Sequence, residues 1–477
     1  MLPDLSDLQD DEDDEPSLTS IWAQQALASA LAPTLLAGPL DASSLRQRAT
    51  HAFASPLAWL PPLCLRLHYA VQGTRITPAN PRLSNDPGKL ADWLNKQPEF
   101  QKACAENPKL RIRAWLPYSP PMQAPPTPLA QVRLPQLATP GEIADWLGIS
   151  PEMLDGYANL QERAIPANKP HIANYRYRWQ RKSQGNARLI EAPKPRLRAL
   201  QRHLLNGILD RIPPHPAAQG CVRHRSAQSY AARHTAYPIL IKLDCRDFFT
   251  SISFGRIRAL FLTLGYPTAS ANCLAALCTH RTPRAIQSQQ PLPEELSPEA
   301  RQTEIRRRQQ LDRRHLPQGG PTSPALANLC AFRLDTRLSA LARQCGGSYS
   351  RYVDDIALSL NEHNPARARR ILHLISDILL EEGFTPNWRK ARIVSASQAQ
   401  QLCGLTINEH VNTPRQDYEQ LKAILHNCRK FGPDSQNHAK HPNFRAHLLG
   451  RIAWHRQSNP NRAQRLQASF EQINWEK

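Results

Sequence analysis

Apolar and polar residues alternate along Ser348–Ser359, on both sides of the turn-like sequence Val353–Asp355. A period of two predicts a pair of strands joined by a tight turn. A further strand is predicted over Pro238–Leu243, which is mostly apolar and leads directly into the acid Asp244. Apolar positions at helical spacing predict helices over residues 323–341 and 366–382, and over much of 414–477, where Arg, His and Gln are frequent.

Three acids therefore stand at the end of a predicted strand or in the turn between strands, namely Asp244, Asp354 and Asp355. Two adjacent acids repel each other, so the pair is costly unless it is solvated or neutralised by cations. An acid at the end of a buried strand needs a partner as well. One interpretation is a solvated turn, because Asp is a favoured turn residue. The alternative is a divalent-metal site formed by the three carboxylates.

The N-terminal part of the chain changes composition several times. Residues 1–16 contain eight acids and neither Lys nor Arg, which predicts a disordered acidic tail. Residues 17–116 contain helix-like segments, including Lys89–Ala105, and enough apolar residues to fold, but no recognisable chemistry. The proline-rich residues 117–135 predict a stiff linker. A capping box beginning at Thr139 then opens a short helix pair, either a lead-in to the next domain or a DNA-binding helix-turn-helix.

The charge of the chain predicts a polyanionic partner. Its 477 residues include 60 Lys and Arg against 40 Asp and Glu, and without residues 1–16 the chain carries a net charge of +28. Nucleic acid is the simplest partner for a basic body of that size. No apolar run has the length of a membrane span, and the N-terminus does not resemble a secretory signal. The ten cysteines form no CxxC pair, which suits reduced thiols and predicts a cytoplasmic location.

Two basic segments and one loop complete the pattern. Residues Tyr175–Pro193 predict a basic hairpin with Arg181 and Arg188 beside its Gly-Asn turn, able to close on a triphosphate or to lie along a nucleic-acid backbone. The charged segment 281–315 predicts a solvated insertion that contains one helix and could touch nucleic acid. The glycine-rich sequence Pro317–Pro324 predicts a loop that runs into a helix, with Ser at the cap and Pro at the first helical position.

Taken together, these motifs resemble those of reverse transcriptases, most closely the bacterial retron-type group. Each motif is unspecific alone, whereas five of them stand here in the family order, and the resemblance covers about residues 136–475. The motifs are Asp244-x-x-x-Phe248-Phe249, the Pro317-Gln318-Gly319-Gly320 loop with Ser323-Pro324, Tyr352-Val353-Asp354-Asp355, Asn387-x-x-Lys390 and a hairpin at Gly404.

The resemblance implies an α+β fold of the right-hand polymerase type, with fingers, an antiparallel-sheet palm, a helical thumb and an N-terminal extension. The implied activity is that of an RNA-directed DNA polymerase, which copies part of a structured non-coding RNA into DNA in a retron anti-phage defence system. The implied partners are this RNA, its DNA product, dNTPs and an effector or toxin protein. The corresponding domains are residues 136–234 for fingers and lead-in helices, 235–411 for the palm with its 281–315 insertion, and 412–477 for the thumb.

The resemblance also implies roles for individual residues. Asp244, Asp354 and Asp355 would hold two Mg2+ or Mn2+ ions, with Asp355 farther from the ions than the other two; one ion activates the primer 3′-hydroxyl and the other neutralises the triphosphate. Lys390 matches the lysine placed to protonate the departing pyrophosphate, although a surface cation after a helix explains it nearly as well. The remaining implied contacts are Phe249 beneath the sugar, where it excludes a ribose 2′-hydroxyl, Gln318 at the incoming nucleotide or template, and Arg181 and Arg188 at its phosphates.

Two departures from the retron pattern leave alternatives open. Tyr230-Ala231-Ala232-Arg233-His234 stands where retron enzymes usually have Asn-Ala-x-x-His, and Leu402-Cys403-Gly404 stands where they usually have Val-Thr-Gly. These positions are associated with handling the cognate RNA, so another defence-type or group II intron-like reverse transcriptase remains an alternative, as does a non-catalytic RNA-binding protein on a polymerase scaffold. The basic thumb is expected to read RNA through its shape and phosphates, with Arg451, Arg456, Arg462 and Arg465 as RNA-binding residues.

Overall fold

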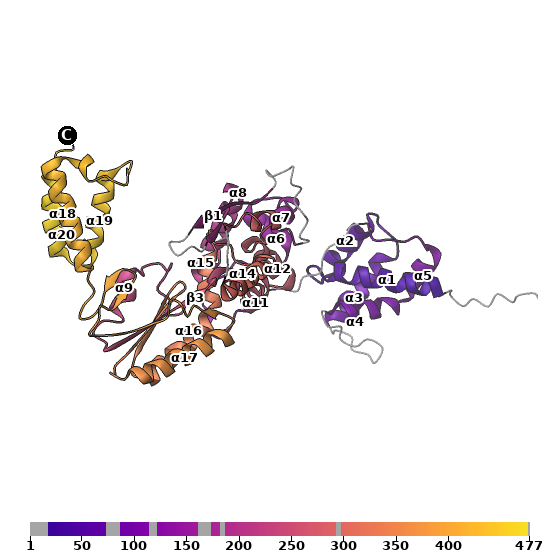
Figure 1. Cartoon of the computed structure of the whole chain (residues 1–477). Helices are drawn as coiled ribbons and strands as arrows, with labels where there is room; N and C mark the ends of the chain where they lie inside the picture. The colour runs from indigo at the N-terminus through magenta and orange to yellow at the C-terminus, as the bar shows by residue number, and fades with distance from the viewer. Residues whose placement is uncertain are drawn as a thin grey trace, which may run out of the picture. The chain divides into compact units, whose positions relative to one another are not determined.

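Figure 1 traces the chain in a computed structural model. The acidic tail predicted for residues 1–16 and the turn of the predicted basic hairpin lie outside the described residues. Within the described part of the chain, no helix combines the length and apolar character that crossing a membrane requires. The structure describes residues 18–72, 86–113, 122–160, 173–181, 187–291 and 297–475.

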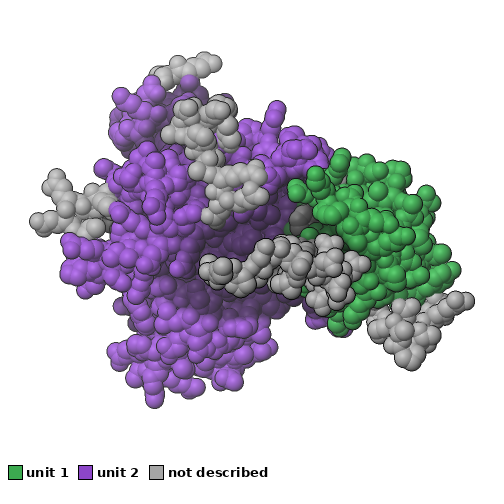
Figure 2. Space-filling model, turned by 90° about the vertical axis from the view of Figure 1, so that its right-hand side faces the viewer, with its two compact units in different colours: residues 1–124, 136–146, 265–271 green, residues 125–135, 147–264, 272–477 purple. Residues whose placement is uncertain are grey.

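The chain divides into two compact units, coloured green and purple in Figure 2. Residues 136–146, which the sequence analysis assigns to the fingers, group with the N-terminal unit. Residues 125–135, expected as linker, group with the larger unit. Unit 1 comprises residues 1–124, 136–146 and 265–271, and unit 2 comprises residues 125–135, 147–264 and 272–477.

Five helices of unit 1 enclose a hydrophobic core of their own, to which Leu31, Leu45 and Phe100 contribute fully buried side chains. The single helix expected over Lys89–Ala105 is instead two helices, α4 and α5. Pro98 begins the second of them, because proline lacks an N–H and disfavours helical geometry at the residue before it. The bounds are Leu18–Leu36 for α1, Ala42–Phe53 for α2, Leu60–Gln72 for α3, Pro87–Asn95 for α4 and Pro98–Glu106 for α5.

Unit 2 contains an antiparallel sheet with the strand order β4-β5-β3-β6, in which β7 also pairs with β3. Strands β4 and β5 form the predicted hairpin, and β3 is the predicted strand that reaches Asp244. Together with the helices the sheet confirms the α+β class. The strands are β3 (Ile239–Arg246), β4 (Ser348–Tyr352), β5 (Asp355–Leu360), β6 (Thr385–Pro386) and β7 (Arg392–Ser395).

Both faces of this sheet are covered, which explains why β3 and β5 are almost continuously apolar instead of alternating. Successive residues of β4 point to opposite faces of the sheet. Tyr349 donates a hydrogen bond to Asp335 of α16, whereas the hydroxyl of Ser350 contacts His234 on the other face. The covering elements are α16 (Phe332–Gln344) and α17 (Pro365–Glu381) on one face, and α9 (Ala227–Ala232) with the hairpin of β8 (Gln401–Leu402) and β9 (Leu405–Thr406) on the other.

The remaining elements include the predicted basic hairpin, β1–β2, and the predicted capping box, in which Thr139 and Glu142 bond each other's backbone N–H groups. The helix expected in the charged segment 281–315 is α14, but its residues Glu304 and Leu311 are buried, so one face of it is packed rather than solvated. The bounds are β1 Tyr175–Arg181, β2 Ala187–Pro193, α6 Pro140–Leu147, α7 Pro151–Ala158, α8 Pro195–Gly207, α10 Phe248–Ser251, α11 Phe254–Thr263, α12 Thr268–Cys278, α13 Arg284–Gln287, α14 Pro298–Leu311 and α15 Ser323–Cys330.

The C-terminal residues form the helices that the sequence predicts, and these helices share a small core. Leu421, Leu448 and Leu466, one from each helix, are fully buried in it. Charged and polar residues occupy the outer faces, so this region presents a basic surface. The helices are α18 (Arg415–Phe431), α19 (Phe444–Ser458) and α20 (Pro460–Glu471).

His234, in the segment that departs from the retron pattern, holds two strands together. It is fully buried, its Nε2 lies 2.6 Å from the hydroxyl of Ser350 in β4, and its Nδ1 lies 2.8 Å from the hydroxyl of Ser359 in β5. A neutral imidazole can donate one of these bonds and accept the other. Burial, with a smaller contribution from Arg233, lowers the pKa of His234 to about 3. The ring therefore stays neutral in the folded protein at physiological pH.

We predict that His234 makes the stability of unit 2 depend on pH. The pKa of the ring is lower in the folded than in the unfolded chain, so the unfolded chain binds more protons below about pH 6.5. The contribution of His234 is complete above that pH and falls by about 1.4 kcal/mol per pH unit below it. Thermal unfolding of the parent and of His234→Gln between pH 7.5 and 5 tests this. The parent should lose more stability on acidification, and equal losses would contradict the assignment.

Candidate active site

The three predicted carboxylates converge at one end of the central strands. Asp244 near the end of β3 and Asp355 at the start of β5 are direct cross-strand partners. Asp354 lies in the turn before β5, and its carbonyl accepts a hydrogen bond of 2.9 Å from the backbone N–H of Cys245. The register of two strands thus brings together acids that are more than a hundred residues apart in the chain.

The negative charges of these carboxylates lie close together. Burial raises the pKa of Asp354, and the neighbouring Asp244 raises it further. Burial together with Asp354 and Asp244 raises the pKa of Asp355 to about 6. Carboxylate oxygens are ligands that suit Mg2+ and Mn2+, and a divalent cation would relieve the repulsion between the acids. The donor set therefore fits a divalent-metal site.

Lys390 and Asn387 hold the Asp244 carboxylate. The Nζ of Lys390 donates to Oδ2 at 2.7 Å, and the Nδ2 of Asn387 donates to Oδ1 at 2.8 Å. Burial lowers the pKa of Lys390, but the hydrogen bond and charge of Asp244 outweigh it and the net shift is upward. Among the described residues, no group of three His, Cys, Asp or Glu side chains forms a ready-made metal cluster. Lys390 is thus tied to the carboxylates rather than being an isolated surface cation.

Six of the eight predicted catalytic and substrate-binding residues line one cavity of about 130 Å³. Asp355 faces a neighbouring hollow instead, beside Tyr230 and Cys403, and Asp244 borders both spaces. Arg181 is exposed at the end of β1 and is not among the described residues that the structure brings to the cavity. The predicted residues that do line the cavity are Asp244, Asp354, Lys390, Arg188, Phe249 and Gln318.

Glycine positions the loop that carries Gln318. The carbonyl of Gln318 accepts a hydrogen bond of 2.9 Å from the backbone N–H of Glu191 in β2. Gly319 has a φ of +135°, and a Cβ there would lie 3.0 Å from the carbonyl oxygen of Glu191. Only glycine combines that conformation with so close an approach. The loop therefore lies directly against the hairpin that carries Arg188.

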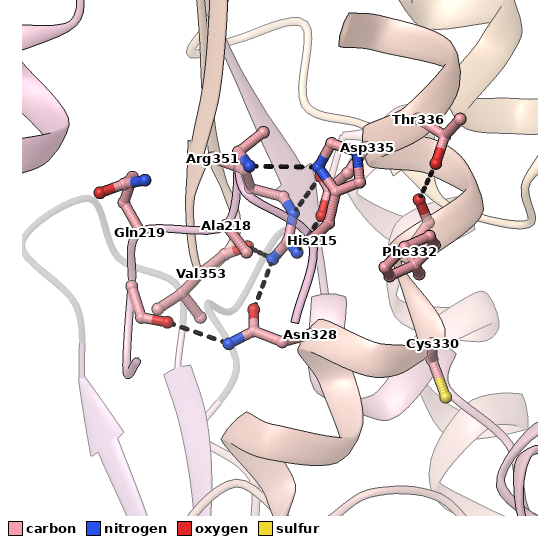
Figure 3. A network of polar contacts seen from close by, with 12 residues as sticks. His215, Ala218, Gln219, Asn328, Cys330, Phe332, Asp335, Thr336, Arg351 and Val353 are labelled. Carbon is pink, nitrogen blue, oxygen red and sulfur yellow. Dashed lines mark hydrogen bonds and ion pairs between the residues drawn. The ribbon is translucent and has the colours of Figure 1, made fainter. Parts of the chain in front are cut away.

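A buried arginine supports the turn that carries Asp354, as Figure 3 shows. Arg351 has no exposed surface and donates to both oxygens of Asp335 at 2.8 and 2.7 Å. Its Nη1 donates to the side chain of Asn328 at 3.0 Å and to the carbonyl of Val353 at 2.8 Å. Val353 has a φ of +59°, which is rare and strained for a β-branched residue. The bond from Arg351 helps to hold that strained carbonyl in place.

Gly220 supports the same turn from the other side. The side chain of Asn328 donates to the carbonyl of Gly220 at 3.0 Å, and the backbone N–H of Gln219 donates to the carbonyl of Arg351 at 2.7 Å. A Cβ on Gly220 would lie 2.5 Å from the backbone nitrogen of Val353. These supporting residues were missing from the sequence prediction, because no local pattern distinguishes them from surface or loop positions.

The four predicted RNA-binding arginines lie on the two last helices in different environments. Arg456 on α19 and Arg465 on α20 are exposed. Arg451 is half-buried, with a 3.5 Å hydrogen bond to Gln420. The guanidinium of Arg462 lies 5.0 Å from the ring centre of Tyr418, in a cation–π contact. Of these four arginines, Arg456 and Arg465 are therefore the ones whose charge is exposed to a polyanion.

The class of the protein follows from comparison with known families. A family model described as "Reverse transcriptase (RNA-dependent DNA polymerase)" matches residues 180–448. The match covers more than half of the chain and includes every cavity-lining residue described above. The chain is therefore an RNA-directed DNA polymerase, a nucleotidyltransferase, whose α+β fold carries a helical N-terminal extension.

Individual relatives narrow this class. The chain is 35% identical over 345 residues to the retron Mx65 reverse transcriptase of Myxococcus xanthus, covering 71% of this chain and 72% of the relative. It is 32% identical over 266 residues to the retron Mx162 reverse transcriptase of the same organism, covering 53% and 52%. It is 28% identical over 262 residues to the retron Ec86 reverse transcriptase of Escherichia coli, covering 54% and 71%. The chain belongs to the retron-type reverse transcriptases.

We predict that Gly220→Ala slows nucleotide incorporation without unfolding the protein. The new methyl group would collide with backbone of the turn, so the turn and Asp354 must shift. A misplacement of about 1 Å costs on the order of 100-fold in rate. The measurement is the rate of single-nucleotide addition to a primer. Gly156→Ala is the matched control, because a Cβ on this exposed glycine of α7 meets nothing within 4 Å. Equal rates in both variants would contradict the predicted role.

Proposed function

We propose that the chain copies part of a structured non-coding RNA into DNA by two-metal nucleotidyl transfer, as the polymerase of a retron that defends its host against phage. The observation that carries the proposal is the convergence of Asp244, Asp354 and Asp355 beside a cavity that also holds Lys390 and Arg188. The substrates would be dNTPs, and the products would be DNA joined to or templated by that RNA. An effector protein would act with the enzyme.

The predicted site residues have proposed tasks. Asp244 and Asp354 hold two Mg2+ ions, with Asp355 nearby; Mn2+ has the same ligand preferences. Bound there, the ions would activate the primer 3′-hydroxyl and neutralise the triphosphate. Arg188 binds the phosphates of the incoming nucleotide, and Arg181 assists from the end of β1. Gln318 contacts the nucleotide or the template.

Two residues act nearest to the reacting atoms. Lys390 is kept protonated by its bond to Asp244, and a protonated amine can give its proton to departing pyrophosphate. Phe249 lines the cavity five residues beyond Asp244 and is half-buried. Its ring would lie beneath the sugar and leave no room for a ribose 2′-hydroxyl, which selects deoxyribonucleotides.

A retron RNA is the favoured template because the three relatives described above are named as retron enzymes and the chain is strongly basic. The second candidate is another defence-type reverse transcriptase, and the departures at Tyr230 and at Leu402-Cys403 favour it. Sequencing of the nucleic acids that co-purify with the protein separates them. Short DNA linked to a structured RNA supports the retron, and its absence supports the second candidate.

The central test is Asp354→Asn. Asparagine keeps the shape of the side chain but removes the anionic ligand, so we expect primer extension on an RNA template with Mg2+ to fall below detection while folding and RNA binding persist. Asp377→Asn in α17 is the matched control, because this Asp is exposed on the surface. Extension by Asp354→Asn at the rate of the parent or of the control would refute the two-metal assignment.

We further predict that the thumb helices contribute to the choice of RNA. Reversing the charge of the exposed Arg456 and Arg465 to Glu should weaken binding of the co-purifying RNA more than binding of an unrelated hairpin of equal length. The salt dependence of binding should fall as phosphate contacts are lost. Reversal of Arg369 and Arg370, which are exposed on α17, controls for total charge. Equal weakening of the binding of both RNAs would show that these arginines contribute affinity without selectivity.

A further inference from the structure

Helix α14 of the charged insertion packs on the segment that follows Asp244. Three of its polar residues, Thr303, Arg307 and Gln310, recur at helical spacing and face that segment. Two short hydrogen bonds fasten the helix there, each 3.0 Å long. The bonds run from Arg246 Nη1 to Thr303 Oγ1 and from Thr250 Oγ1 to Gln310 Oε1. Hydrogen bonds of Thr303 and Gln310 thus hold α14 on this segment.

Arg307 itself lines the cavity that contains Asp244 and Asp354. Its side chain is only 13% exposed. Its two acidic partners are distant, since its Nε lies 3.8 Å from Asp247 and its Nη1 lies 3.5 Å from Glu304. Glu304 has closer partners, Arg308 at 3.1 Å and Gln290 at 2.8 Å. A guanidinium with five N–H donors thus has a single, long hydrogen bond within the described part of the chain.

A cation that lines a small cavity and has few hydrogen bonds is suited to bind an anion there. Buried charges are normally paired and hydrogen-bonded, and planar guanidinium groups match phosphate oxygens with two parallel bonds. The cavity contains the carboxylates proposed to hold the metal ions, so the anion that enters there with those ions is the triphosphate of a nucleotide. A template or primer backbone would rather meet arginines on the protein surface than a side chain that is only 13% exposed.

We propose that Arg307 binds the triphosphate of the incoming dNTP, in exchange for its long contacts with Asp247 and Glu304. Together with Arg188 of β2 it would form the cationic part of the nucleotide site. The inference rests on the proposed polymerase function and deepens it. It also gives the insertion 281–315 a role in substrate binding, because α14 supplies a wall of the site.

The test measures nucleotide affinity separately from catalysis. The full-length protein is given poly(rA) with an oligo(dT) primer, and the KM and kcat for dTTP are determined. The Kd for dTTP is measured on the same template with a primer that ends in a 3′-dideoxynucleotide, so that no reaction occurs. Arg307→Gln removes the charge, Arg307→Lys keeps it without the planar fork, and Arg306→Gln removes an exposed charge one residue away.

We expect Arg307→Gln to raise both the KM and the Kd for dTTP about tenfold or more, because hydrogen bonds to charged groups are lost. Its kcat, melting temperature and affinity for the primer–template should stay within about twofold or a few degrees of the parent. The KM and Kd of Arg307→Lys for dTTP should lie between those of the parent and of Arg307→Gln, because lysine keeps the charge but lacks the planar fork of donors. Arg306→Gln should match the parent.

Several results would overturn the inference. If Arg307→Gln leaves the Kd for dTTP unchanged in a parent enzyme that extends primers, the inference is wrong while the proposed function stands. An equal loss of dTTP affinity in Arg306→Gln would show that only the total charge of the helix matters. A parallel loss of stability, kcat and primer–template binding would assign Arg307 to packing of α14. If the parent neither binds dTTP nor extends the primer, the inference and the proposed function both fail.

Discussion

The site depends on one buried ion pair, Arg351 with Asp335, which connects β4 to α16 behind the sheet. Two charges without exposed surface are costly unless their hydrogen bonds are satisfied. Here the guanidinium makes four short hydrogen bonds, and one of them fixes the carbonyl of Val353 in a strained turn. Breaking the pair would leave a buried charge, so the arrangement tolerates little movement. That rigidity holds the turn that carries Asp354 in place, so that Asp354 and Asp244 line the same cavity.

Around this fixed turn, the cavity is assembled from segments that are distant in the chain. The hairpin β1–β2 brings Arg188, the glycine-rich loop brings Gln318, and α14 brings Arg307. Backbone contacts at Gly220 and Gly319 allow these segments to approach closely. Specific packing, rather than any local motif, therefore sets the distances between the charged groups. A polymerase site needs such precision, because reacting groups must be held close to their attack geometry.

Local patterns in the sequence predicted much of this structure. The two strands around Val353–Asp355, the acid after the apolar strand, the capping box at Thr139 and the glycine-rich loop all follow from short-range periodicity or backbone preference. The burial of Arg351 could not be predicted, since an arginine in a polar strand reads as a surface residue. The position of Arg307 at the cavity could not be predicted for a similar reason. Its helix looks solvated from its charge, and only tertiary packing turns one face of it toward the cavity.

One measurement tests most directly the claim that the Arg351–Asp335 pair positions the turn that carries Asp354. Replacing both partners by apolar residues, Arg351→Met with Asp335→Leu, removes the charges together, a change that buried pairs often tolerate without loss of stability. The measured quantity is the rate of single-nucleotide addition by the double variant, with thermal unfolding and RNA binding recorded on the same preparation. The account predicts a folded, RNA-binding protein whose rate falls about 100-fold or more. A double variant that adds nucleotides at the rate of the parent would contradict it.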